Sequence, residues 1–335
     1  MASHYPAGIL PGVMQNGWMQ PRRVFVLGAG AIGASVGALL FEAGVDCVFV
    51  VRDSEHGRAL VERGVDLRFP RAARAIRVPT ARTTTATPDD LVLLATMGHE
   101  TDAALEGVDP HVTVASFQNG VTPLDAIMRR GHETLAAMVY VPAERRGPGV
   151  IALPGVPVPG TVLLGGWPSR EGRFGPWMAD RLRIVGFRAE VESDIGPWVR
   201  AKLLVNLGGI VAALCDDPPA EVIAAAQDEA RAVWRGTGQR FEEVAALLAR
   251  VGELGTEPVD GHERMGGSTR SALARGDRLE TAYLHRTIIE AGRAASIPTP
   301  MNERLVALAE EAVEKRWVPG ATSAEELRHR VLGSE

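Results

Sequence analysis

The sequence predicts an α/β domain with a parallel sheet, followed by an all-α domain. Short apolar strands alternate with helical segments in the first half of the chain, and only helical segments follow after about residue 192. Strand–helix alternation is typical of a parallel sheet, because parallel neighbours need a long crossover connection, usually a helix. The length of 335 residues also suits two domains, at roughly 150 residues for each domain.

Five short apolar segments are the expected strands of the first domain, and their continuous apolar character indicates burial on both faces. They lie at residues 24–27, 47–51, 91–96, 112–117 and 138–141. Helices are expected at 31–43 and 54–63, because a glycine follows each of these segments. The arginine-rich segment 68–82 predicts a solvated hairpin or sheet edge rather than an anion-binding strip, since prolines interrupt it.

Four helical segments are expected in the second domain, at 197–214, 219–251, 277–295 and 302–315. The predicted boundary gives a first domain of residues 21–192 and a second of residues 193–330. Residues 1–20 contain no Asp, Glu, Lys or Arg, and prolines interrupt them. They are expected to form a disordered arm, and not a secretory signal, because no basic region precedes an apolar stretch.

The composition excludes several classes of protein. Hydrophobic residues make up 46% and charged residues 23%, which excludes a disordered or fibrous chain. The net charge of −5 argues against nucleic-acid partners and against a polybasic membrane anchor. Cys47 and Cys215, the only cysteines, allow one disulfide at most, so a reducing cytoplasm is the expected location. Residues 24–41 are uncharged and long enough to span a membrane, but clustered glycines favour a strand, a turn and a helix.

A glycine motif joins the first expected strand to the first expected helix. This GxGxxG motif consists of Gly28, Ala29, Gly30, Ala31, Ile32 and Gly33. In this context the first glycine permits a tight turn, the second lets the backbone approach a pyrophosphate, and the third lets the helix pack closely on the strand. The unpaired N–H groups of the helix N-terminus favour phosphate binding. The motif predicts a Rossmann-type dinucleotide-binding domain, with an unliganded glycine turn as the alternative.

The residues after the second expected strand indicate which dinucleotide binds. An acidic residue there would accept a hydrogen bond from the ribose 2′-OH of NAD, whereas an arginine suits the 2′-phosphate of NADP. Arg52 follows this strand directly and favours NADP(H). Asp53 follows one position later and is a competing signal for NAD, and an exposed arginine without a ligand is the remaining alternative for Arg52.

The helix expected at 197–214 is apolar almost all round and carries Lys202 and Asn206 on one face. A buried ammonium group is costly unless a carboxylate or a ligand satisfies it, and desolvation lowers the pKa of a lysine toward proton transfer. The alternative is a lysine whose ammonium group reaches solvent at the helix margin. Glu280 is a candidate partner, because it shares a helix face with Tyr283 and Leu284, although a solvated first-turn glutamate would look the same.

Asn119 follows the fourth expected strand, in the turn Gln118-Asn119-Gly120. Ligands of open α/β sheets bind beyond the carboxyl ends of strands, so Asn119 is a candidate binding residue, although Asn-Gly is also a plain turn signal. His99 and His285 are isolated and lack the spacing of metal ligands. The sequence therefore predicts no metal site.

These segments together resemble the ketopantoate reductase family (2-dehydropantoate 2-reductase) over about residues 22–315. The resemblance rests on an ordered set of segments: the glycine motif with Arg52, the QNG turn at Asn119, the strand and loop from Tyr140 to Gly149, the AKLxxN segment 201–206, and the PTPxN segment 298–302. It implies that Lys202 is the general acid, that Glu280 is an active-site glutamate, and that Asn119 contacts the nicotinamide and substrate region. It also implies that Ser268 and Asn206 bind substrate.

Three positions depart from the family pattern. Met97 stands where the family has a lysine near the cofactor and substrate, Ile210 where it has a substrate-binding asparagine, and His285 where it has another asparagine. The loss of one buried polar contact typically costs about 1–3 kcal/mol, so these changes predict weakened recognition of ketopantoate. Apolar side chains at Met97 and Ile210 favour a larger or less polar substrate, with Met97 still beside the cofactor.

The sequence therefore predicts an NADPH-dependent reductase that acts on a small 2-oxo acid, either 2-dehydropantoate or a related carbonyl compound. One alternative is a diverged tailoring dehydrogenase that acts on another carbonyl or imine. A second is an NADP-binding sensor without chemistry, although a sensor needs no proton donor. A homodimer is a candidate assembly, but no interface signal stands out in the sequence.

Overall fold

The computed structural model describes residues 18–168 and 172–333. Residues 1–17 lie outside the described residues, so most of the predicted N-terminal arm does too. The chain divides into two compact units. Of the described residues, the first unit comprises those up to Gln118, together with those of Pro123–Ile195 and Val251–Arg264. The second unit comprises Asn119–Thr122, Gly196–Arg250 and the described residues from Met265 onward. The division after Ile195 lies three residues beyond the predicted boundary, but the return of Val251–Arg264 to the first unit was not predicted.

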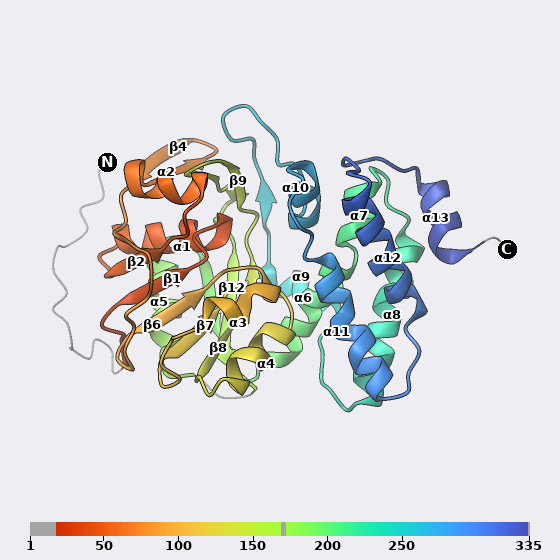
Figure 1. The fold of residues 1–335 in the computed structure, drawn as a ribbon, viewed down its shortest axis with the longest axis horizontal. Coiled ribbons are helices and arrows are strands. Elements are labelled where there is room, and N and C mark those ends of the chain that lie inside the picture. The colour runs from red at the N-terminus through yellow and green to blue at the C-terminus, as the bar shows by residue number, and fades with distance from the viewer. Residues whose placement is uncertain (1–17, 169–171, 334–335) are drawn as a thin grey trace. The chain divides into compact units, whose positions relative to one another are not determined.

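An eight-stranded sheet forms the centre of the first unit (Figure 1). β12 pairs antiparallel with β8, and every other pair of neighbouring strands in this sheet is parallel. The α/β class predicted for this half is confirmed. In spatial order the strands are β13 (Arg188–Val191), β12 (Thr161–Gly166), β8 (Thr134–Tyr140), β7 (Thr113–Ser116), β6 (Leu91–Leu94), β1 (Val24–Leu27), β2 (Cys47–Val50) and β5 (Thr80–Ala81).

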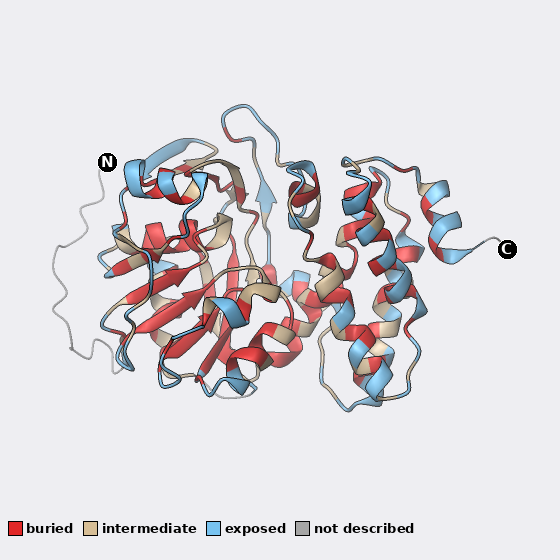
Figure 2. Ribbon diagram, in the orientation of Figure 1, coloured by how far each residue is buried: buried red, intermediate tan, exposed pale blue. Residues whose placement is uncertain are grey.

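Two hydrophobic layers cover the faces of this sheet, and Figure 2 shows its central strands buried. Val24 and Val26 of β1 face a core shared with α1 (Ala31–Glu42) and α5 (Gly175–Ile184), whereas Phe25 and Leu27 face a second core. That second core includes side chains near α3 (Thr101–Ala104) and from α4 (Thr122–Arg129). Burial on both faces explains why these strands are continuously apolar.

The arginine-rich segment forms the predicted hairpin. β3 (Val65–Phe69) and β4 (Ala72–Ile76) are antiparallel, and β4 is an edge strand of a second sheet of order β4-β3-β10-β9. β9 is Glu144–Gly147 and β10 is Val150–Ala152. Three arginines of this segment form ion pairs within the first unit: Arg68 with Asp66, Arg71 with Glu257, and Arg74 with Glu42. These pairs favour the solvated interpretation, because carboxylates of the protein already neutralise the guanidinium groups.

A two-stranded sheet of β11 (Gly155–Val156) and β14 (Gly255–Thr256) attaches the segment Val251–Arg264 to the first unit.

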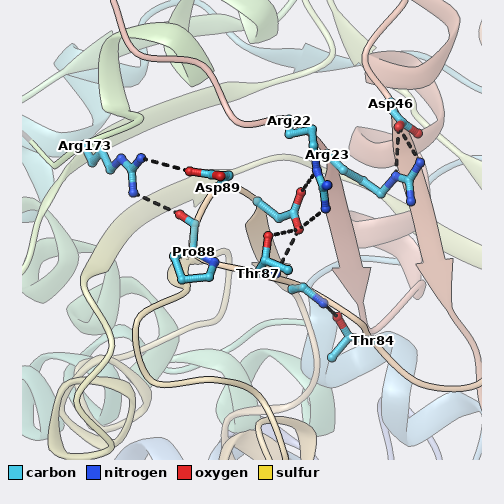
Figure 3. A network of polar contacts seen from close by, with 10 residues as sticks. Arg22, Arg23, Asp46, Thr84, Thr87, Pro88, Asp89 and Arg173 are labelled. Atoms are coloured by element: carbon cyan, nitrogen blue, oxygen red, sulfur yellow. Dashed lines mark hydrogen bonds and ion pairs between the residues drawn. The ribbon is translucent and has the colours of Figure 1, made fainter. Parts of the chain in front are cut away.

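Ion pairs hold the amino-terminal ends of the central strands together (Figure 3). Arg22, just before β1, donates two hydrogen bonds to the buried carboxylate of Asp90, just before β6, at 3.1 and 3.0 Å. Arg23 donates to Asp46, just before β2, at 2.8 Å. Asp90 also accepts from the backbone and the hydroxyl of Thr87 at 2.8 Å. These contacts stabilise the amino-terminal edge of the sheet. Ligands of open α/β sheets bind at the opposite edge, where the carboxyl ends of the strands meet.

The second unit is helical, as predicted, but it contains more helices than expected. Its helices are α6 (Gly196–Leu207), α7 (Gly209–Leu214), α8 (Ala220–Gly236), α9 (Val244–Val251, which ends at the unit boundary), α10 (Ser268–Ala274), α11 (Thr281–Ala294), α12 (Pro300–Glu314) and α13 (Ala324–Leu332). The helix predicted at 219–251 is two helices, because the chain turns at Gly238, whose φ is +69°. The helix predicted at 277–295 begins only at Thr281, with Glu280 as its N-cap residue.

The segment predicted as one helix at 197–214 is divided at Gly208 into α6 and α7. A side chain at Gly208 would approach Ile223 of α8 to 3.1 Å, so glycine allows these helices to pack closely. By length and composition alone, Gly196–Leu214 would be long and apolar enough to cross a membrane. Because 61% of this stretch is buried inside the structure, it also matches the core helix of a soluble protein, which passes the same test.

Candidate functional site

The glycine turn lies at the carboxyl end of β1, and two of its glycines are required by local geometry. Gly28 has a φ of +91°, and a Cβ atom there would lie 2.5 Å from the backbone nitrogen of Thr96. A Cβ atom at Gly33 would lie 2.2 Å from the carbonyl oxygen of Gly28, so α1 could not pack against the turn. These two positions agree with the predicted turn and the predicted close packing of helix on strand.

Gly30 differs from the other two glycines, because a Cβ atom there would meet nothing within 4 Å. Its φ of −79° is also accessible to other residues, so the fold itself does not require glycine at this position. Gly30 is the N-cap residue of α1, and no side chain caps this helix end. The first-turn N–H groups of α1 therefore remain for a ligand, and the bare backbone at Gly30 leaves room for a phosphate beside them. The turn fits a dinucleotide.

His56, for which no role was predicted from the sequence, connects the glycine turn to a second loop of the first unit. Its Nδ1 accepts a hydrogen bond from the backbone N–H of Gly149 at 3.0 Å, so its Nε2–H donates to the carbonyl oxygen of Ala29 at 2.7 Å. Burial lowers the pKa of His56, which favours this neutral form. The histidine follows Ser54, the N-cap residue of α2 (Glu55–Arg63). It therefore holds the glycine turn from the side of β2.

Arg52 and Asp53, which follow β2, both form ion pairs with other residues of the protein. Asp53, the competing signal for NAD, forms an ion pair with Arg58 at 2.8 Å. Arg52 has a side chain 83% exposed, and its Nη1 donates to Oε1 of Glu100 at 2.9 Å. Glu100 ends the 3₁₀ turn η1 (Gly98–Glu100) after β6, and its Oε2 accepts from the backbone N–H of Met97 at 3.3 Å. The strands β6 and β2 flank β1 in the sheet, so Glu100 and Arg52 lie at the carboxyl ends of the two strands beside the glycine turn.

Gln118, for which no role was predicted from the sequence, has a structural part in the same region. It follows β7 and is 7% exposed. Its Nε2 contacts the carbonyl oxygens of Thr96 and Met97 at 3.2 and 3.3 Å and the hydroxyl of Thr101 at 3.0 Å. This side chain therefore fixes the turn after β6, in which Met97 lies. Met97 is partly buried at the carboxyl edge of the sheet.

In the second unit, three of the predicted residues form one hydrogen-bonded chain. Asn119 Nδ2 donates to Glu280 Oε2 at 3.0 Å, and Asn206 Nδ2 donates to Asn119 Oδ1 at 3.3 Å. Glu280 lies at the start of α11, and Asn206 lies in the last turn of α6. The three side chains come from segments far apart in the sequence, which is typical of a binding site and not of a local turn. Asn119 is thus more than a turn residue.

Lys202 lies one turn before Asn206 on α6, and it is half-buried. The chain has 36 lysines and arginines in total, and only Lys202 and Lys315 are lysines. Lys315 forms an exposed ion pair with Glu311 one turn earlier on α12. An arginine side chain does not release its proton in a protein, whereas a lysine can, so an arginine at residue 202 could not serve as a proton donor. This scarcity of lysine is a further signal in the sequence that distinguishes residue 202.

Ser268 and Ile210 are not part of the hydrogen-bonded chain of Asn206, Asn119 and Glu280. Ser268 is exposed as the first residue of α10, and the next residue, Thr269, lies 3.3 Å from the hydroxyl of Thr281 in α11. Ser268 is therefore available to a ligand. Ile210 is fully buried in the helical core, so it offers no surface to a substrate. The expectation of a less polar substrate then depends on Met97 alone.

His285 lies on α11 and belongs to a buried polar network with Asn302 and Glu229. Its Nδ1 lies 2.7 Å from Asn302 Oδ1, and Asn302 Nδ2 donates to Glu229 at 2.7 Å. Burial lowers the pKa of His285 to about 4, so the ring is neutral at neutral pH. Among the described residues, no group of three or more His, Cys, Asp or Glu side chains could hold a metal ion.

Comparison with known proteins gives consistent matches. The family model described as "Ketopantoate reductase PanE/ApbA" matches residues 24–169. Two proteins named 2-dehydropantoate 2-reductase are each 27% identical, one from Pyrococcus horikoshii over 302 residues and one from Archaeoglobus fulgidus over 303 residues. The matches cover 85% and 87% of this chain, and 96% and 97% of the relatives.

A solved structure agrees with the sequence matches. The PanE/ApbA family ketopantoate reductase from Ralstonia eutropha superposes with a TM-score of 0.72 at 25% identity, over 88% of this chain and 99% of that protein. The likeness thus extends through both the sheet unit and the helical unit, which carry the glycine turn and the Asn206–Asn119–Glu280 chain respectively. Residues 24–169 match the model of the ketopantoate reductase family, and the chain is similar to ketopantoate reductases over most of its length.

Proposed function

We propose that this protein is an NADPH-dependent oxidoreductase that reduces the carbonyl group of a 2-oxo acid, 2-dehydropantoate or a close relative, to a hydroxyl group. The relatives from P. horikoshii and A. fulgidus carry the name of this reaction. The observation that carries the proposal is the hydrogen-bonded chain Asn206–Asn119–Glu280, which begins on the same helix as Lys202.

The first unit would hold the dinucleotide. The first-turn N–H groups of α1 and the bare backbone at Gly30 suit its pyrophosphate, and Arg52 suits the 2′-phosphate of NADPH. When bound, NADPH supplies the hydride. The contact of His56 with Ala29 holds the glycine turn in one conformation, so the phosphate-binding N–H groups are already oriented before binding.

Residues of the second unit would act on the substrate. Lys202 donates a proton to the carbonyl oxygen as negative charge develops there, and its ammonium group stabilises that charge before the transfer. The Asn119 amide keeps one N–H and one lone pair for a ligand after its contacts with Glu280 and Asn206. The exposed hydroxyl of Ser268 suits the carboxylate or hydroxyl of the substrate.

Met97 gives a specific reason to consider a second substrate. Its side chain replaces a cation with an apolar thioether at the carboxyl edge of the sheet, which would weaken binding of a small polar acid and favour a larger or less polar carbonyl compound. Under this alternative the cofactor and the proton donor stay the same, and only the preferred substrate changes. A cytoplasmic location and a homodimer remain predictions.

The decisive experiment follows the loss of reduced-nicotinamide absorbance when the purified protein and NADPH are mixed with 2-dehydropantoate or with a panel of 2-oxo acids of increasing size. Turnover that is fastest with 2-dehydropantoate supports the proposed reaction. Turnover that is fastest with a bulkier acid supports the second substrate class. Binding of NADPH without turnover of any carbonyl compound would replace the reductase with a sensor.

A further inference from the structure

The carboxylate of Glu100 forms an ion pair with the guanidinium group of Arg52, which is the group expected to bind the 2′-phosphate of the cofactor. Arg52 Nη1 donates to Glu100 Oε1 at 2.9 Å, although the Arg52 side chain is largely exposed and could point elsewhere. The two residues come from different turns, after β2 and after β6, so the ion pair connects the two neighbours of β1 in the sheet. It therefore lies where the ribose end of a dinucleotide is expected, because that end binds beside the strand that follows the glycine turn.

Glu100 is held in this position by its own turn. Its second oxygen, Oε2, accepts from the backbone N–H of Met97 at 3.3 Å, and only 28% of its side chain is exposed. The turn itself is fixed by Gln118, which donates to the Met97 carbonyl oxygen at 3.3 Å. A carboxylate anchored through one oxygen keeps the other oxygen directed at Arg52.

On these grounds, and resting on the proposed function, we infer that Glu100 is a specificity-determining residue that competes with the 2′-phosphate of NADPH for Arg52. The phosphate must replace a carboxylate that already neutralises the guanidinium group, and it then lies near a fixed negative charge. NADH carries a neutral 2′-OH at this place, so it meets neither cost. Glu100 thereby reduces the preference for NADPH over NADH that Arg52 alone would give. Asp53 does not play this part, because it pairs with Arg58.

The test is a titration of the purified protein with NADPH and, separately, with NADH, followed by the fluorescence of the reduced nicotinamide. Glu100→Gln removes the charge and keeps an oxygen that can accept from the Met97 N–H, so the turn is preserved. We expect this variant to bind NADPH about 5-fold more tightly and to bind NADH with an affinity changed less than about 2-fold, as befits a surface charge contact. Glu106→Gln is the matched control, since it removes one carboxylate from the exposed loop after α3 and should change neither affinity.

A second pair of variants checks that the effect passes through Arg52. Arg52→Gln should weaken NADPH binding, and in the Arg52→Gln background Glu100→Gln should improve NADPH affinity by a smaller factor than it does with Arg52 present, because only the repulsion between carboxylate and phosphate is then relieved. The inference is overturned if Glu100→Gln leaves the ratio of NADPH to NADH affinity unchanged, or if it changes both affinities equally. Failure of the unmodified protein to bind either dinucleotide would instead overturn the proposed function, which keeps the two results distinguishable.

Discussion

The side-chain amide of Asn119 is oriented by Glu280, since its Nδ2 donates to Glu280 Oε2 at 3.0 Å. A carboxylate only accepts hydrogen bonds, so the amide nitrogen must face it. The amide oxygen then faces Asn206, whose Nδ2 donates to it at 3.3 Å. One contact at the start of α11 thus sets which polar group Asn119 presents to each neighbour. The remaining N–H and lone pair suit a ligand with both a donor and an acceptor, such as the hydroxyl group of a hydroxy acid.

Asn119→Asp is expected to reduce kcat/KM for the preferred 2-oxo acid more than Asn119→Ala does. Alanine removes two hydrogen bonds, which typically costs about 5-fold to 100-fold in a binding step. Aspartate also places a second carboxylate against Glu280, and like charges at that distance raise the pKa of one of them. The aspartate variant should therefore recover activity as the pH falls, whereas the alanine variant should not. Steady-state kinetics of both variants over a pH series test this, and identical pH profiles would contradict it.

Lys202→Arg is expected to lower kcat by about 10²–10⁴-fold and to leave NADPH affinity unchanged. Arginine keeps the positive charge and most of the side-chain length, but it does not release a proton. Loss of turnover would thus separate proton donation from charge stabilisation. Lys315→Arg is the matched control, because it makes the same exchange at the only other lysine, in an exposed ion pair on α12. Turnover of Lys202→Arg within 2-fold of the unmodified protein would remove Lys202 as the general acid.

Gly30→Ala and Gly33→Ala are expected to fail for different reasons. A methyl group at Gly30 meets no atom within 4 Å, so this variant should keep its melting temperature and lose NADPH affinity by at least about 10-fold, since the methyl would lie in the phosphate's path. A methyl group at Gly33 would lie 2.2 Å from the Gly28 carbonyl oxygen, so this variant should unfold more easily, by about 1–3 kcal/mol. Thermal melts and NADPH titrations of the two variants decide the question. Tight NADPH binding by Gly30→Ala would place the pyrophosphate elsewhere.

The sheet unit was predictable from sequence because its signals are local. Val24–Leu27 is apolar, lies between polar residues and a glycine turn, and forms β1 with the predicted bounds. The hairpin of β3 and β4 follows from the same local logic of short strands and a turn. Local patterns do not show which segments meet. The return of Val251–Arg264 to the first unit depends on pairing between β11 and β14, about a hundred residues apart, which no periodicity reveals.

The candidate site was predictable in its residue types but not in its contacts. The Asn119–Glu280 hydrogen bond joins residues 161 positions apart, and only the resemblance to a family suggested that they meet. The position of Glu280 was also misjudged, because its helix begins one residue later and Glu280 caps the helix without lying inside it. Glu100 and His56 were missed since a lone glutamate and a lone histidine carry no pattern, and their roles depend on the neighbours they contact.

The lowered pKa of His285 is expected to make the free energy of unfolding depend on pH. The His285 ring is fully buried, and burial lowers its folded-state pKa to about 4. The amide nitrogen of Asn302 donates to Glu229 and to the carbonyl oxygen of Ala226, so its amide oxygen faces His285. His285 Nδ1 therefore donates to Asn302 Oδ1. An unfolded histidine has a pKa of about 6.5, so between these two values the unfolded state binds a proton that the folded state does not. The free energy of unfolding should therefore be largest above pH 6.5 and fall by about 3 kcal/mol as the pH drops toward 4.

The test compares denaturant unfolding of the protein and of His285→Asn over that pH range. Asparagine still donates to Asn302 from the place of Nδ1 but cannot be protonated, so its stability should fall less steeply with pH even though its absolute stability is lower. The half-buried His56 and the buried His132 also have lowered pKa values, and they contribute a background slope of the same sign. For this reason the quantity to compare is the difference in slope between variant and parent. His111→Asn, which replaces an exposed histidine, should retain the parent's slope, and equal slopes for all three proteins would mean that His285 is not neutral in the folded state.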